Sequence, residues 1–76
     1  MTKLPAVNGA EVIRALERAG FVVVRVSGSH HRLVHRDDAS KTTTVPVHGS
    51  KALKKGTLRN IINQSGMTVE EFDGLL

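Results

Sequence analysis

The stretch Gly28-Ser29-His30-His31 decides how this 76-residue chain folds. It separates two strand-like runs, residues 21–27 and 32–35. Gly-Ser is turn chemistry, because glycine adopts positive φ freely and serine hydrogen-bonds to nearby backbone. The two histidines open the second strand, where successive side chains point to opposite faces. One histidine can therefore contribute to the core while its neighbour faces solvent beside the turn.

A helix is predicted before the first strand. Asn8 is a good N-cap, and Glu11 stands three residues later, at capping-box spacing. Gly20 is placed to end the helix, as glycine does after a C-cap. The apolar residues that follow Asn8 recur at helical spacing, which predicts an amphipathic helix: Val12, Ile13, Leu16 and Ala19.

Two further strands are predicted after the Gly-Ser turn. Residues 36–41 form a polar hairpin loop, and residues 42–47 form the third strand of an antiparallel meander. Pro46 has no N–H to donate, which places this strand at a sheet edge. In the first strand we expect Val22, Val24 and Val26 on one face, and Phe21, Val23 and Arg25 on the other.

The C-terminal part is predicted to be helical. Residues 48–55 read as a lysine-rich loop, and Gly56-Thr57 begins a helix that stops at Gly66. Thr68 and Glu71 make a second capping box, which predicts a short C-terminal helix over residues 68–76. The fold class is α+β: one small domain over residues 1–76, in the order α-β-β-β-α with a short C-terminal helix after a lead-in at residues 1–7. Helices are expected to cover one face of the three-stranded antiparallel sheet.

Composition limits the functional classes. There is no cysteine, so disulfides and thiolate metal ligands are excluded, which fits a reducing compartment. No apolar run approaches the roughly 20 residues of a membrane span, and no signal-peptide pattern opens the chain. We therefore expect a soluble, cytoplasmic protein with no membrane partner.

Positive charge is concentrated in the middle of the chain. The formal net charge is +4, yet residues 21–66 carry eight basic side chains against Asp37 and Asp38, a net of +6. The last ten residues carry three acidic side chains and no basic one. A basic middle suits a polyanion such as nucleic acid, although a solvated surface explains the same charge equally well.

Histidine is the residue type that titrates nearest to neutrality. A metal site is disfavoured because adjacent histidines point to opposite faces, and His31 and His35 are separated by about 13 Å at strand rise. Satisfying backbone groups at strand ends remains an open interpretation for His31, His35 and His48. His30 directly follows the tight turn, so its ring is expected to be exposed, and we favour it as a catalytic acid/base.

The lysine-rich stretch from Lys51 to Thr57 is the second candidate. Backbone N–H groups at a helix start attract phosphate, and flanking lysines add positive charge. A plain solvated loop is the alternative. No nucleotide-binding glycine motif occurs. The only aromatic residues are two phenylalanines expected in the core, so reading of single-stranded bases by stacking is disfavoured.

Four motifs in this order resemble the HicA family of bacterial toxins, over nearly the whole chain from Asn8 onward. They are Gly20-Phe21 before a valine-rich strand, Gly28-Ser-His-His31, Thr44-Val-Pro-Val-His48, and Lys54-Lys-Gly-Thr-Leu-Arg59; Ser65 to Phe72 also resembles the family's C-terminal end.

The resemblance implies a fold similar to double-stranded RNA-binding domains. It also implies an mRNA interferase, an endoribonuclease that arrests translation and growth and is neutralised by a HicB-like antitoxin. His30 takes the family's catalytic position, with no metal, cofactor or small-molecule ligand expected. The residues expected to contact RNA are Gly28, Ser29, Arg32, Lys51, Lys54, Lys55, Thr57 and Arg59. A non-catalytic double-stranded RNA-binding module and a small protein-binding adaptor remain alternatives.

Overall fold

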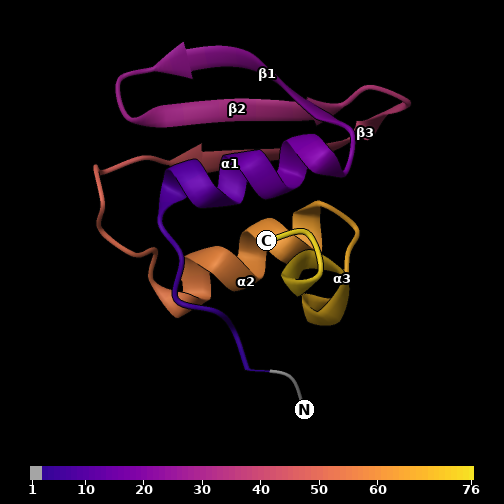
Figure 1. The fold of residues 1–76 in the computed structure, drawn as a ribbon. Coiled ribbons are helices and arrows are strands. Elements are labelled where there is room, and N and C mark those ends of the chain that lie inside the picture. The colour runs from indigo at the N-terminus through magenta and orange to yellow at the C-terminus, as the bar shows by residue number, and fades with distance from the viewer. Residues whose placement is uncertain (1–2) are drawn as a thin grey trace.

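Six elements follow one another along residues 3–76, the part of the chain that the computed structural model describes (Figure 1). The predicted order is confirmed. Of the lead-in predicted for residues 1–7, residues 1 and 2 lie outside the described range. The elements are α1 (Gly9–Arg18), β1 (Phe21–Ser27), β2 (His30–His35), β3 (Asp38–Pro46), α2 (Lys55–Gln64) and α3 (Val69–Asp73).

The three helices lie on one side of the sheet, as predicted (Figure 1). The strands pair antiparallel in the order β1-β2-β3. The core between sheet and helices holds side chains from every element. No helix of residues 3–76 lies over the opposite face, and Val22 and Val24 of β1 are about half exposed. The largest fully buried side chains are Val12, Leu16, Leu33, Val45, Leu58, Ile61, Ile62 and Phe72.

Both predicted capping boxes are present. The Asn8 side chain accepts from the Glu11 N–H at 2.9 Å, and the Glu11 carboxylate accepts from the Asn8 N–H at 3.0 Å. Thr68 and Glu71 make the same pair of bonds at the start of α3. Gly20 follows α1 with φ 101°, a conformation that disfavours any side chain. Local hydrogen bonds thus define where these helices begin and end.

A β-bulge in β1 corrects the predicted faces. Val23 pairs with Leu33, but the register then shifts, so that Arg25 pairs with Arg32 and Val26 with His31. Leu33 is buried, and alternation along β2 turns Arg32 to the open face. Arg25 therefore shares the open face, and Val26 is on the side of Leu33. The expected alternation was wrong beyond Val24 because a bulge adds one unpaired residue.

The predicted loop at residues 36–41 is shorter than expected. His35 pairs with Asp38, so the turn consists of Arg36 and Asp37, and β3 begins at Asp38 rather than at Thr42. Polar residues at the start of an exposed edge strand have the composition of a loop, which explains the error. Pro46 ends β3, and β3 is an edge strand as predicted. No helix within residues 3–76 is long and apolar enough to cross a membrane.

Candidate active site

The tight turn between β1 and β2 presents His30 to solvent. Gly28 has φ 58° and no heavy atom within 4 Å of where a Cβ would lie, so the need for glycine here is conformational rather than steric. Ser27 pairs with His30 across the turn. The His30 side chain is exposed, as predicted. An exposed imidazole at the start of a strand is free to exchange protons with a ligand.

The loop between β3 and α2 lies at the same end of the sheet as this turn (Figure 1). The Val47 N–H donates to the Ser29 carbonyl at 2.7 Å, which continues the pairing past the end of β3. The Leu53 N–H donates to the Val7 carbonyl at 2.8 Å. These two backbone bonds fix both ends of the loop, so its side chains are held near the turn.

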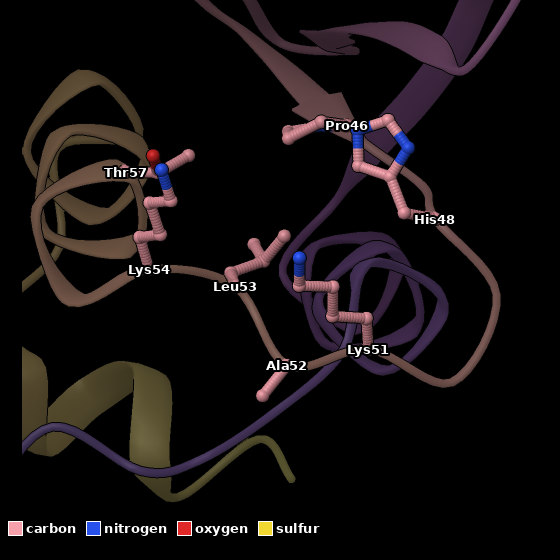
Figure 2. Close-up of a pocket in the computed structure, with 7 residues that line it drawn as sticks. All are labelled: Pro46, His48, Lys51, Ala52, Leu53, Lys54 and Thr57. Carbon is pink, nitrogen blue, oxygen red and sulfur yellow. The ribbon is translucent and has the colours of Figure 1, made fainter.

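A cavity of about 340 Å³ opens between this loop and the first turn of α2. Figure 2 shows Pro46 and His48 on one side, with Lys54 and Thr57 across the side chain of Leu53. Of the residues predicted to contact RNA, the cavity brings Lys51, Lys54 and Thr57 together. Its lining consists of Pro46, His48, Lys51, Ala52, Leu53, Lys54 and Thr57.

The first turn of α2 adds donors to one wall of this cavity. Lys54 is the N-cap, and its side chain makes no capping hydrogen bond. No acidic residue lies in the first turn. Backbone N–H groups at a helix start have no intrahelical acceptor and carry partial positive charge. This wall therefore favours an anion.

The other predicted contact residues surround this region. Lys55 and Arg59 are exposed on α2 and do not line the cavity. Arg32 lines a second hollow, of about 300 Å³, at the edge of the sheet. Thr57 lines both, so the hollow continues the cavity along α2. The remaining lining of the hollow is Thr42, Thr43, Thr44, Asn60, Ile61 and Gln64.

His35 and His31 have structural contacts. The His35 ring packs edge-on against Phe21, with centroids 5.1 Å apart. Its Nε2 lies 3.0 Å from the Ala19 carbonyl, and its Nδ1 accepts from the Asp37 N–H at 3.1 Å. The neutral Nε2–H tautomer satisfies both bonds. His31 is half-buried, with Nδ1 3.4 Å from the Ser29 carbonyl. These contacts match the strand-end interpretation of both residues.

His48 does not fit that interpretation. Its ring makes no hydrogen bond or ion pair within residues 3–76, and it lines the cavity beside Lys51. The sequence pattern placed His48 at the end of the Thr44–His48 motif but assigned it no role at the site, because only the folded loop brings it to the lysines. Its position two residues after the edge proline was the available signal. No group of three or more potential metal ligands comes together among residues 3–76.

This end of the molecule combines a solvent-exposed imidazole with cations and helix-start N–H groups around a hollow. Those groups can transfer protons and stabilise a phosphate.

A search of the curated proteins found no match. The sequence model described as the HicA toxin of bacterial toxin–antitoxin systems matches residues 9–67, from the start of α1 to just past the end of α2, and so leaves α3 outside the match. Because the match covers well over half of the chain, this protein belongs to the HicA toxin family.

Proposed function

We propose that this HicA toxin is an mRNA interferase, a metal-independent endoribonuclease of the cytoplasm in which His30 acts as acid/base. The observation that carries the proposal is the exposed His30 at the same end of the sheet as the cationic cavity. The cavity supplies Lys51 and Lys54 for phosphate, and His30 supplies an imidazole that can take up or release a proton.

RNA carries its own nucleophile. The 2′-hydroxyl stands beside the scissile phosphate, so the enzyme needs mainly proton transfer, orientation and charge stabilisation. His30 can take or give the proton. Lys54 and Lys55, together with Arg32 on the adjoining hollow, are proposed to stabilise the charge that develops on the phosphate.

Recognition is proposed to rest on the RNA backbone. Both phenylalanines, Phe21 and Phe72, are buried, so the described surface offers no aromatic ring other than histidine for stacking bases. The cations at Arg32, Lys51 and Lys54 suit phosphate contacts instead. Gly28 and Ser29 bring backbone at the turn close to the same strand of RNA, and Lys55, Thr57 and Arg59 extend the contact along α2.

The test is cleavage of a defined RNA by the purified protein in excess chelator. We expect cleavage to persist, with a 2′,3′-cyclic phosphate and a 5′-hydroxyl at the cut. An RNA with one 2′-deoxy nucleotide at the cleaved position is the matched control, and it should bind but stay intact. A protein that binds the ribose RNA without cutting it would instead be the non-catalytic RNA-binding module.

Toxins of the HicA family pair with HicB antitoxins. We propose that a HicB-like partner of this chain covers His30 together with Lys51, Lys54 and Lys55, since masking cations and catalyst together blocks both binding and chemistry. An acidic partner surface would associate fast and lose rate as salt rises. Hydrogen exchange with and without the antitoxin should show protection of the β1–β2 turn; protection confined to residues 68–76 would contradict this.

A further inference from the structure

His48 stands out among the four histidines because it faces a cavity and has no partner within the described chain. Figure 2 shows its ring beside Pro46 at the rim of the cavity, across from Lys54 and Thr57. Within residues 3–76, His48 is hydrogen-bonded only through its backbone, where its carbonyl accepts from the Lys51 N–H at 3.2 Å. The imidazole is therefore left exposed to a ligand.

Pro46 links His48 to His30. Pro46 is the cross-strand partner of His30, and directly paired residues in an antiparallel ladder share a face of the sheet. Neighbouring strands lie about 4.8 Å apart. Pro46 also lines the cavity together with His48. The two histidines thus flank one proline, His30 on the adjacent strand and His48 two residues along the chain.

Cleavage by the 2′-hydroxyl requires two proton transfers at different places. The 2′-oxygen loses a proton as it bonds to phosphorus, and the 5′-oxygen gains one as its bond to phosphorus breaks. Attacking and leaving oxygens lie roughly in line, on opposite sides of the phosphorus. One imidazole on one side of the phosphate does not reach both oxygens at once. A second proton-transfer group is needed on the other side.

We propose that His48 is this second catalytic residue, an inference that rests on the ribonuclease function proposed above. One neutral imidazole of the pair His30 and His48 takes the 2′-hydroxyl proton, and the other, as imidazolium, gives a proton to the 5′-oxygen. The products are a 2′,3′-cyclic phosphate and a 5′-hydroxyl, and no oxidant, metal or water is consumed. The charged groups that line the cavity beside His48 are Lys51 and Lys54. They stabilise the non-bridging oxygens of the phosphate.

The first experiment compares wild type with His48→Ala and His48→Gln under single-turnover conditions. Each variant should lose at least about 10²-fold in the cleavage rate at saturating RNA. Affinity for an uncleavable 2′-deoxy RNA should stay close to wild type. The glutamine variant can still hydrogen-bond but cannot titrate, so its failure separates proton transfer from binding. A plot of the wild-type cleavage rate against pH should be bell-shaped. In each His48 variant, either the rising or the falling side of this plot should be missing.

The second experiment replaces the 5′-bridging oxygen at the cleaved bond with sulfur. A thiolate leaves without a proton, so this substrate needs no general acid. The sulfur substrate should restore the rate of one variant, either His30→Ala or His48→Ala, and leave the other slow. The restored variant identifies the acid.

Three results would overturn the inference. The first is that both His48 variants cleave RNA at the wild-type rate. The second is that the His48 variants lose activity only because they bind RNA more weakly. The third is that the sulfur substrate restores the rate of both His30→Ala and His48→Ala, or of neither. Each leaves the ribonuclease proposal standing, provided that the wild type still yields the cyclic phosphate. A wild type that does not cut RNA at all would reject the proposed function itself, and this inference with it.

Discussion

The two ends of the sheet carry the same residue types and use them differently. At the β2–β3 turn, His35 is bonded through both ring nitrogens and packs on Phe21. At the opposite end, His30 and His48 are exposed, and neither ring has a partner within residues 3–76. Residue type alone therefore does not tell a histidine held by structural contacts from one that is exposed to a ligand in this fold. The partners of the ring do.

Charge follows the same division. Around the β2–β3 turn, Arg36 lies 3.8 Å from Asp37, and Asp38 accepts from Ser40. At the other end, Lys51 and Lys54 have no carboxylate within ion-pair distance among the described residues. Cations left uncompensated beside a cavity favour an anionic ligand, whereas the charges of the β2–β3 turn mostly satisfy one another. Five substitutions test this contrast.

His30→Ala should have the largest effect on activity. Loss of the acid/base is expected to lower cleavage by at least about 10²-fold. The side chain is exposed, so the free energy of unfolding should change by no more than about 0.5 kcal/mol. Single-turnover cleavage and urea denaturation measure the two quantities. Equal cleavage by wild type and variant would remove His30 from the site and erase the contrast between the two ends.

His35→Ala should show the reverse. The substitution removes the edge-on contact with Phe21 and leaves the half-buried Ala19 carbonyl without its partner. An unsatisfied group of this kind costs about 1–3 kcal/mol, and an aromatic pair about 0.5–1.5 kcal/mol. Urea denaturation should therefore show a loss of about 2 kcal/mol. The folded variant should cut RNA at the wild-type rate; a selective loss of cleavage with unchanged stability would make His35 a functional residue.

Lys54→Ala and Arg36→Ala form a matched pair of cation removals. Lys54 lines the cavity, whereas Arg36 lies at the other end of the sheet. Loss of a phosphate contact in Lys54→Ala should weaken RNA binding. It should also make the slope of the logarithm of the binding constant against the logarithm of salt concentration shallower by roughly 0.7 for single-stranded RNA. Arg36→Ala should leave the slope unchanged. Equal effects of the two variants would mean that net charge, rather than the cavity, attracts RNA.

Local chemistry explains what the sequence could predict. Each capping box, at Asn8 and at Thr68, depends on two residues three positions apart. Gly20 and Gly28 adopt positive φ, and each does so in a turn formed by its immediate neighbours in the sequence. Exposure of His30 follows from its place after the Gly-Ser turn. Each of these features is determined by neighbouring residues, so the local sequence pattern was sufficient to predict it.

The features that escaped prediction depend on contacts between distant residues. The bulge after Val23 is visible only in the register with β2, and the early start of β3 depends on the pairing of Asp38 with His35. The position of His48 in the cavity requires the Val47 to Ser29 bond and the anchoring of Leu53 to Val7. The sequence of one segment alone does not predict any of these contacts, because each depends on a second segment elsewhere in the chain.

The smallest effect is expected from Asp38→Asn, which probes the ordered charges of the β2–β3 turn. The Ser40 hydroxyl at 2.6 Å and the Ser40 N–H at 3.1 Å donate to the Asp38 carboxylate and hold its pKa below the usual value, with smaller help from Lys41 and His35. A pKa that is lower in the folded than in the unfolded chain stabilises the fold above the unfolded pKa of about 3.9, and this contribution is lost as pH falls through the folded pKa.

The difference in thermal midpoint between wild type and Asp38→Asn should therefore be small and constant from pH 7 to about pH 5, and should shrink below the unfolded pKa of about 3.9. Added salt should reduce this difference, because the carboxylate is fully exposed and its attraction to Lys41 is screened. Cleavage at pH 7 should be unaffected, since Asp38 pairs with His35 at one end of β2, whereas His30 lies at the other end of that strand. A midpoint difference that persists unchanged to pH 2, or a loss of cleavage, would show that the two ends of the sheet are coupled rather than separate.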